Sequence, residues 1–235
     1  MDETTVSVSN ELLQANLILL HHQVLDAFGH VSVRHPQKNG RFLMSIALPP
    51  SQVKAEDIIE FNLDASPVDP TNQSLYIERF IHSSIYQARP EVMAICHHHA
   101  KALLPFCITS TSLQAVTQTG GAMGEKVAVW DSRDDFGDTN LLISNAKQAD
   151  SLVTSLGQAW MILIRRHGVC VLGQNLRELV FRAVFACQDA EVQLRAAALG
   201  DIEALSAGEL KLTSQPSVKA IDRCWQHWLE QIKAH

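Results

Sequence analysis

Three consecutive histidines, His97 to His99, end an apolar stretch, VMAICHHH, that has the character of a buried strand. Because side chains alternate between the two faces of a strand, His97 and His99 share one face and His98 takes the other. Two imidazoles at this spacing can bind one metal ion through neutral nitrogen atoms. The spacing alone leaves a second interpretation equally open, in which the rings bond to backbone or carboxylate groups.

A third histidine and a carboxylate favour the metal interpretation. His167 follows the apolar segment ILIRR, and Gly168 behind it lets the backbone turn or be approached closely. Glu78 and His82 are one helical turn apart in LYIERFIHSSIY, so they share a helix face. Such a pair is ordinarily a surface or capping pair, but the apolar residues around Glu78 predict burial. A buried carboxylate needs a partner, and a divalent cation supplies one.

The elements that must position these residues alternate between helices and strands. Apolar spacing and capping residues predict helices at 10–28 (with Gly29 as its C-cap), 76–88, 145–156, after Asn175, and 217–235. Strand patterns are predicted at 30–35, 41–45, 57–63, 92–99, 126–130, 160–166 and 169–173. Because many strands are neighbours in sequence, we expect a single α/β domain over residues 1–235, a three-layer α/β/α arrangement with a central, mostly antiparallel sheet.

Composition narrows the class of protein. The 235-residue chain has a formal net charge of −6 and no cluster of Lys and Arg, which argues against nucleic acid or an anionic membrane as partner. The acidic start MDETTVSVSN is unlike a signal peptide, and the longest apolar runs are too short to cross a bilayer. Five dispersed cysteines predict free thiols in a reducing compartment. We therefore expect a soluble, cytoplasmic protein.

The segment IERFIHSSIYQARPEVMAICHHHA resembles the central part of the class II aldolase/adducin family, in which a helical glutamate leads to a strand ending in His-x-His. RRHGV resembles the family's strand with a third histidine, and AFGHVSVRHP resembles its glycine-centred turn. By this resemblance Glu78, His97, His99 and His167 are metal ligands. It also implies a nine-stranded sheet between helix layers and a homotetramer with sites at subunit interfaces. This ligand set suits a divalent metal, with Zn²⁺ the first expectation and Mn²⁺ or Fe²⁺ the alternatives.

The sequence departs from the sugar-phosphate aldolases of this family where those enzymes hold phosphate. SIALPPS stands in place of a T-P-S-G-type turn, His30 in place of an asparagine, and Tyr76 with Ile77 in place of two serines. The tyrosine that those enzymes use as a proton donor has no clear match in QAVTQTGGAMG. Because these changes remove hydroxyl donors around a dianion, a phosphorylated substrate is not expected.

What remains resembles a family branch that includes metal-dependent decarboxylases of hydroxylated aromatic or pyridine carboxylates, which also carry an E-R-F-I-H helix and a tail like RCWQHW. This resemblance implies a metal-dependent carbon–carbon lyase for a non-phosphorylated, carboxylate-bearing small molecule. Decarboxylation through a metal-stabilised enolate is the expected reaction. Glu78 is a candidate proton carrier, and His82 is a second candidate or a residue that orients the site.

Four residues are candidates for substrate binding: His30, Ser32, Arg34 and Tyr76. The first three alternate onto one face of the strand at 30–35, where Arg34 can pair with a carboxylate in a bidentate fork. A surface arginine and a tyrosine that only packs are the alternative interpretations.

Other functions stay open at this point. One is an aldolase for a small hydroxy-oxo acid or a sugar phosphate, and another is a non-haem iron oxygenase. A third is a non-catalytic binding module like the adducin head domain. Four retained ligand residues weigh against that module, because a scaffold has no need of a buried carboxylate beside three imidazoles.

Overall fold

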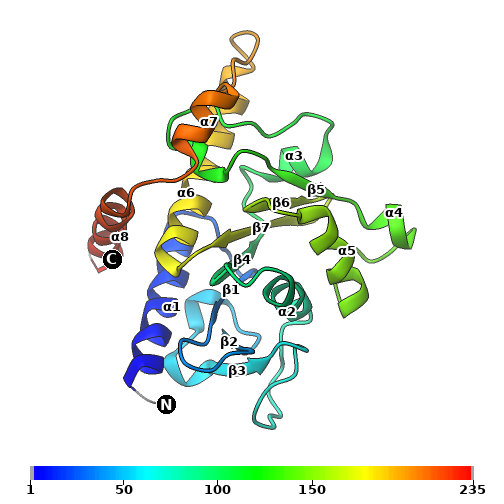
Figure 1. Ribbon diagram of the computed structural model, residues 1–235, viewed down its shortest axis with the longest axis vertical. Helices are drawn as coiled ribbons and strands as arrows, with labels where there is room; N and C mark the ends of the chain where they lie inside the picture. The colour runs from blue at the N-terminus through cyan, green and yellow to red at the C-terminus, as the bar shows by residue number, and fades with distance from the viewer. Residues whose placement is uncertain (1–2, 234–235) are drawn as a thin grey trace.

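The computed structural model describes residues 3–233, and one sheet runs through its middle (Figure 1). Its strands are β1 (His30–Arg34), β2 (Arg41–Ser45), β3 (Ile58–Asn62), β4 (Ala94–His98), β5 (Ala128–Trp130), β6 (Met161–Ile164) and β7 (Gly168–Gly173). Their order across the sheet is β3-β2-β1-β4-β7-β6-β5. Neighbouring strands are antiparallel except β5 and β6, which are parallel. The predicted α/β class and the mostly antiparallel sheet are confirmed.

The sheet has seven strands within residues 3–233, so the expectation of nine is wrong for this part of the chain. In the described part of the chain, the ladder continues beyond these strands only as a single bridge between Phe61 and Pro67. Pro67 and Pro70 have no N–H to donate, so the segment after β3 cannot continue a regular ladder.

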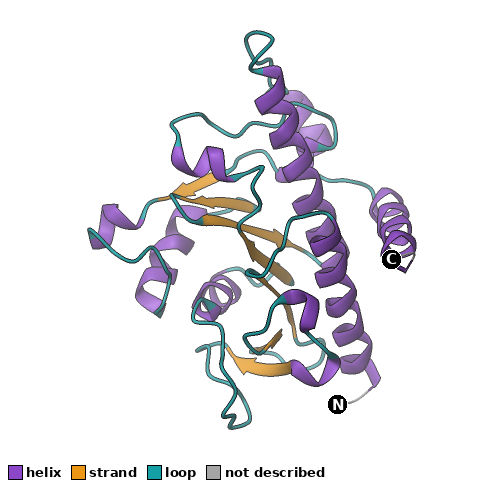
Figure 2. Cartoon of the chain, turned by 180° about the vertical axis from the view of Figure 1, so that it is seen from behind, coloured by secondary structure: helices purple, strands orange, loops and turns teal. Residues whose placement is uncertain are grey.

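Helices cover both faces of the sheet, which gives the predicted three layers (Figures 1 and 2). They are α1 (Glu3–His21), α2 (Arg79–Ala88), α3 (Leu104–Ile108), α4 (Ser132–Phe136), α5 (Ala146–Leu156), α6 (Leu176–Ala196), α7 (Ala207–Thr213) and α8 (Val218–Lys233), with short 3₁₀ helices at Pro50–Gln52, Ala55–Asp57 and Gly120–Met123. The helices α1, α6 and α8 pack together on one face, and α2 and α5 pack together on the other. Among the described residues, no helix combines the length and apolar character needed to cross a membrane.

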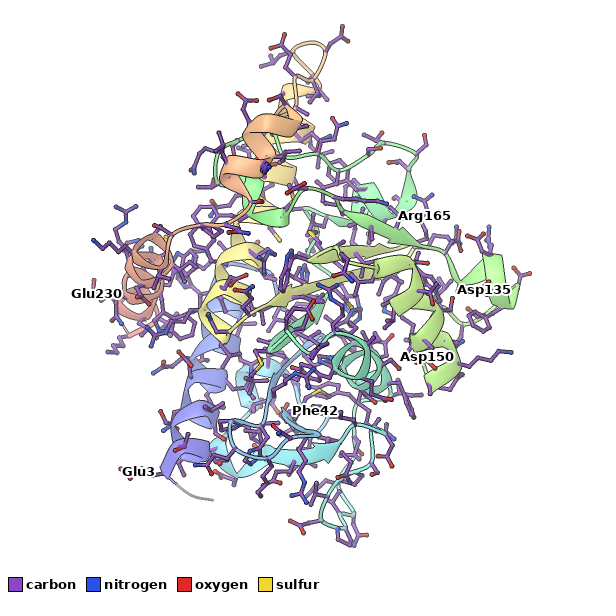
Figure 3. All side chains as sticks on the ribbon, viewed as in Figure 1. Glu3, Phe42, Asp135, Asp150, Arg165 and Glu230 are labelled. Atoms are coloured by element: carbon purple, nitrogen blue, oxygen red, sulfur yellow. The ribbon has the colours of Figure 1, made fainter. Side chains whose placement is uncertain are left out.

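Strand alternation divides the core into two clusters, one on each face of the sheet. On β4, Ala94 and Cys96 lie in the cluster under α1 and α6, whereas Ile95 lies in the cluster under α2 and α5. Figure 3 shows side chains filling the space between the layers, with Phe42 in the interior and Glu3 and Glu230 at the periphery. By the same alternation His97 faces α2 and α5, which brings it to the side from which Glu78 comes.

Two predicted helix boundaries are corrected by the structure. The predicted helix at 10–28 is α1, which begins at Glu3 and ends at His21 because Gln23 adopts a left-handed φ of 58°. Gly29 is therefore not a C-cap; it has a φ of 90° in the turn before β1, and Phe28 is 70% exposed. The predicted helix at 76–88 begins at Arg79, with Glu78 as its N-cap residue.

The other predicted helices lie where expected. Asn145 and Asn175 cap α5 and α6 by accepting backbone N–H bonds from Gln148 and Glu178. The helix predicted at 217–235 is α8, which begins at Val218 and is described to Lys233. Ala234 and His235 lie outside the described residues.

Candidate metal centre

The structure brings together the four residues expected to bind a metal. One potential ligand atom each of Glu78, His97, His99 and His167 lies within 4.8 Å of those of the other three. Glu78 comes from the start of α2, His97 from β4, His99 from just beyond β4, and His167 from the turn between β6 and β7. Because β4 pairs with β7, with His98 opposite Val169, that turn lies beside the end of β4.

The distances within this group fit a single divalent ion. Glu78 Oε2 lies 3.3 Å from His97 Nε2 and 3.6 Å from His167 Nε2. Two donors bound to one ion at about 2.0–2.2 Å are roughly 3–4 Å apart in a tetrahedral site. The ring centroid of His99 lies 4.8 Å from that of His97 and 5.0 Å from that of His167.

The surroundings of His97 also fit a metal ligand. Its Nδ1 lies 3.1 Å from the carbonyl oxygen of Val169 and donates to it, which leaves a lone pair on Nε2. This Nε2 is buried and makes no hydrogen bond within residues 3–233. A backbone carbonyl that fixes the tautomer is typical of histidines that bind metal. The residues present therefore fit a divalent ion.

Glu78 is buried, and a segment on the same face of the sheet holds its carboxylate in place. The backbone N–H of Ile143, in the segment before α5, donates to Glu78 Oε1 at 3.1 Å. Burial alone would raise the pKa of Glu78, but the nearby His97 and His167 and this N–H outweigh it and lower the pKa to about 2. The carboxylate is therefore ionised at neutral pH, as a metal ligand must be.

Unusual backbone conformations surround His167. Arg166, directly before it, has a φ of 60°, and Leu141, in the segment that leads to Ile143, has a φ of 66°. Gly168, directly after it, has no room for a side chain: a Cβ there would lie 2.5 Å from the carbonyl oxygen of His98 and 2.7 Å from His99 Cδ2. The prediction that Gly168 permits close backbone approach is confirmed. The contributions of Leu141 and Ile143 have no signal in the sequence, because they come from a loop.

A buried hydrogen-bonded chain extends from this group into the space between β1 and α2. His30 Nδ1 lies 2.7 Å from His82 Nε2, and Ser32 Oγ lies 2.6 Å from His82 Nδ1. Ser32 Oγ also lies 2.8 Å from the hydroxyl oxygen of Tyr86. We call these four residues the His30–Tyr86 chain. The sequence prediction missed Tyr86, although its position four residues after His82 places it on the same helix face.

Both histidines of this chain are neutral. Burial, with a smaller effect of His97, lowers the pKa of His82 to about 3. Burial is also the main cause that lowers the pKa of His30, followed by the neighbouring His82 and His97. His82 uses both ring nitrogens within the chain, so it orients its neighbours and has no nitrogen left for a substrate.

The predicted substrate-binding residues fall into two groups, Ser32 with Arg34 and His30 with Tyr76. His30, Ser32 and Arg34 face α2 together, as strand alternation predicts. Arg34, however, donates from Nε to the carbonyl of Val92 and from Nη2 to the carbonyls of Tyr86 and Arg89. It therefore satisfies carbonyls at the end of α2. Ser32 is fully buried inside the chain.

Tyr76 and His30 are the other group. The Tyr76 hydroxyl donates to the carbonyl of Leu48, and its ring centroid lies 4.6 Å from that of His30. The His30 centroid lies in turn 5.2 Å from that of His97. Contact of any of these residues with a substrate stays a prediction.

Solvent reaches the ligand group on the side of His99. His99 lines a cavity of about 610 Å³ together with the segment 20–26 and part of α6. Leu20, Val24 and Leu25 form an apolar part of its wall, and Asp26 and Lys101 are polar. His97, by contrast, has no exposed surface.

Comparison with known proteins gives the same assignment of fold. The sequence profile of the Class II Aldolase and Adducin N-terminal domain matches residues 10–194. The decarboxylase tropJ of Talaromyces stipitatus is 35% identical, over 92% of this chain and 90% of its own length. The 4-hydroxy-3-prenylphenylpyruvate oxygenase/4-hydroxy-3-prenylbenzoate synthase of Streptomyces roseochromogenus subsp. oscitans is 25% identical, over 80% of this chain and 66% of its own length.

Among solved structures, the L-fuculose 1-phosphate aldolase of Glaciozyma antarctica superimposes with a TM-score of 0.80 over 98% of this chain and 90% of its own, at 22% identity. At that identity the likeness concerns the fold alone. The profile match spans more than half of the chain, and the relative at 35% identity spans nearly all of it. This chain therefore belongs to the class II aldolase and adducin N-terminal domain family.

Proposed function

We propose that this protein is a metal-dependent carbon–carbon lyase that decarboxylates a small, non-phosphorylated carboxylic acid. The observation that carries the proposal is the group of Glu78, His97, His99 and His167, in a chain whose relative at 35% identity is named a decarboxylase. Hydroxylated aromatic or pyridine carboxylates are the proposed substrate class, because they combine a carboxylate with a neighbouring hydroxyl.

Glu78, His97, His99 and His167 are the proposed ligands, with Zn²⁺ the first candidate and Mn²⁺ or Fe²⁺ the alternatives. When bound, the ion supplies a Lewis acid that stabilises negative charge developing on substrate oxygens. In the reaction the bond between the carboxylate carbon and its neighbour breaks. Carbon dioxide leaves, the electron pair stays on the neighbouring carbon, and that carbon takes up a proton.

The chain's own residues bind the substrate and move the proton. Glu78 is the proposed proton carrier: its ionised carboxylate accepts a proton from the substrate hydroxyl and returns it to the carbon that has lost carbon dioxide. His30 and Tyr76 are the proposed substrate contacts at the margin of the ligand group. Ser32, Arg34 and His82 act through these contacts or through α2, because their polar atoms are already bonded to protein groups.

The surroundings of Glu78 support a substrate without phosphate. The two residues before it, Tyr76 and Ile77, offer one hydroxyl, which is bonded to Leu48, and an apolar side chain that is 48% exposed. Neither can replace a pair of serine hydroxyls around a phosphate dianion.

The test is direct measurement of the products. We expect protein loaded with Zn²⁺ or Mn²⁺ to release carbon dioxide from a member of a panel of hydroxybenzoates and hydroxypyridine carboxylates, and Glu78→Gln to release none. Aldehyde formation from hydroxy-oxo acids or sugar phosphates, without carbon dioxide, would instead identify an aldolase. Purified protein that binds no metal would point to a binding module of the adducin kind.

An oxygenase is the second candidate, and the relative named as an oxygenase at 25% identity favours it. Oxygen uptake by protein loaded with Fe²⁺, dependent on the added acid, would identify this activity. Equal product yields under air and under argon would exclude it.

We also propose a homotetramer with sites at the subunit interfaces. The half-buried position of His99 beside a cavity supports an additional wall from another subunit. Light scattering coupled to size-exclusion chromatography should give about four times the chain mass of 26.0 kDa.

A further inference from the structure

We propose that Tyr86, Ser32 and His82 hold His30 in the one tautomer that presents an N–H, on Nε2, to an anionic substrate oxygen beside the ligand group. The identity of that oxygen as a carboxylate rests on the proposed function, whereas the tautomer rests on the geometry of the His30–Tyr86 chain. Tyr86 is thus a positioning residue, and His30 is the residue that selects for substrate groups that accept a hydrogen bond.

The number of available hydrogens limits the direction in which hydrogen bonds are donated along the His30–Tyr86 chain. A tyrosine or serine hydroxyl has one hydrogen, and a neutral imidazole has one hydrogen shared between two nitrogens. The chain has three contacts, so each contact uses one hydrogen. Both rings are buried, and no carboxylate lies within hydrogen-bond distance of either among the described residues, so both are neutral imidazoles.

Three arrangements satisfy all three contacts, because Ser32 Oγ can accept two hydrogen bonds. In the first, Tyr86 donates to Ser32, Ser32 donates to His82 Nδ1, and His82 Nε2–H donates to His30 Nδ1. The hydrogen of His30 is then on Nε2. In the other two, His30 Nδ1–H donates to His82 Nε2, and His82 Nδ1–H donates to Ser32. Ser32 then either donates to Tyr86 or accepts from it as well.

Each of these two leaves one buried hydroxyl hydrogen without an acceptor. It is that of Tyr86 where Ser32 donates, and that of Ser32, which is fully buried, where Tyr86 donates. Tyr86 is 1% exposed, and Ser32 is the one hydrogen-bond partner of its hydroxyl among the described residues. A buried donor without a partner loses its hydration and gains nothing in return. The guanidinium carbon of Arg34, 4.7 Å from the Tyr86 ring centroid, further favours the phenol as a donor, because a nearby cation withdraws electron density from the ring. The first arrangement is therefore the stable one.

The position of His30 brings this donor to the metal centre. His30 is opposite His97 in the pairing of β1 with β4, and their ring centroids are 5.2 Å apart. His30 lies outside the four-residue ligand group, and its side-chain hydrogen bond among the described residues uses Nδ1, so its Nε2 is left for another partner. An N–H fixed at this place binds a carboxylate or phenolate oxygen and disfavours a substrate group that itself donates.

Histidine tautomers can be read directly from ¹⁵N shifts and long-range ¹H–¹⁵N couplings. In Zn²⁺-loaded protein labelled with ¹⁵N-histidine, we expect both His30 and His82 to carry hydrogen on Nε2, with assignments from His30→Gln and His82→Gln. Hydrogen on Nδ1 of either ring would overturn the proposal. This readout needs no ligand, so it is independent of the proposed function.

The second test compares two variants that each remove one buried hydroxyl from α2. Tyr86→Phe keeps the ring and loses the terminal donor, and Ser83→Ala loses a hydroxyl that donates to Leu63 outside the chain. With salicylate as the probe and calorimetry of Zn²⁺-loaded protein, we expect Tyr86→Phe to weaken binding by about threefold to tenfold, the effect of one hydrogen bond. Ser83→Ala should bind like the wild type.

Equal salicylate affinity of Tyr86→Phe and wild type would overturn the positioning role of Tyr86. If the wild type binds no salicylate but shows the expected tautomers, the carboxylate-bearing substrate of the proposed function is wrong and the direction of the chain stands.

Discussion

At the scale of single residues, three of the four proposed metal ligands are supported by separate backbone segments. The carbonyl of Val169 orients His97, and the N–H of Ile143 orients Glu78. Gly168 lets the backbone at His98 approach the turn that carries His167. Because these supports come from separate segments, a change at one of them should affect metal binding without removing a ligand.

Gly168→Ala tests this dependence. The added Cβ would overlap the carbonyl of His98, which is backbone and cannot move easily. We expect a loss of about 1–3 kcal/mol in the free energy of unfolding and a lower metal content, measured by urea denaturation and elemental analysis. Gly200→Ala is the control, since a Cβ there meets nothing within 4 Å. Equal metal content in both variants would contradict the close packing at Gly168.

The ligands themselves are tested by metal content. His97→Ala and Glu78→Gln should each lower the affinity for Zn²⁺ by more than about tenfold, because each removes one direct ligand. His98→Gln is the matched control, since His98 is the neighbour on the other face of β4. Retention of both metal and activity by the first two variants would refute the site.

At the scale of elements, α6 holds the loop that follows α3. Asp189 accepts hydrogen bonds from the backbone N–H groups of Val116 and Thr117 and from the Thr117 hydroxyl. Gln193, one turn later, accepts from the N–H of Gln114 and donates to the carbonyl of Ser112. This loop is the stretch in which the sugar-phosphate aldolases of the family carry their proton-donating tyrosine, so α6 determines its position relative to the rest of the fold.

Asp189→Asn should release this loop. The amide retains one acceptor oxygen but replaces the other with a donor, which faces a backbone N–H. We expect a loss of about 1.5–3 kcal/mol in the free energy of unfolding, measured in urea, and faster hydrogen exchange at residues 114–119. Glu191→Gln, exposed on the same helix, should change neither quantity.

At the scale of the whole molecule, the core contains several histidines that are neutral when folded. His98 is fully buried, and its Nδ1 accepts from the N–H of Ala100. Burial, followed by the effects of His97 and His99, lowers its pKa from 6.5 to about 3. In the unfolded chain it regains a pKa of about 6.5, so only the unfolded state takes up this proton as the pH falls below 6.5.

Acid should therefore destabilise the metal-free protein. As the pH falls from 6.5 to 5.5, His98 should contribute a loss of about 1 kcal/mol in the free energy of unfolding. Urea denaturation with a chelator present, at both pH values, should show a smaller loss for His98→Gln by this amount. An identical pH dependence in the two proteins would show that His98 is protonated in the folded state.

The supporting strand pattern was accessible from the sequence because it depends on local periodicity, whereas the full set of four ligands was implied by the family resemblance. Alternation along 92–99 separates His97 from His98, and the apolar runs on either side of His167 predict β6 and β7. Helix ends were less accessible: α1 ends at His21 although the apolar spacing continues to Phe28, because spacing does not reveal a left-handed residue such as Gln23.

The sequence by itself thus determined the class of fold, the metal ligands expected from the family resemblance, and the residues that share the face of β1. Only the tertiary structure decided what those residues contact. It directs Arg34 to the carbonyls at the end of α2, encloses Ser32 and Tyr86 in a buried chain with His82, and places Ile143 on Glu78. The physical reason is that periodicity specifies the direction of a side chain relative to its own element, whereas its partners depend on how distant elements pack and on loop conformations that have no period.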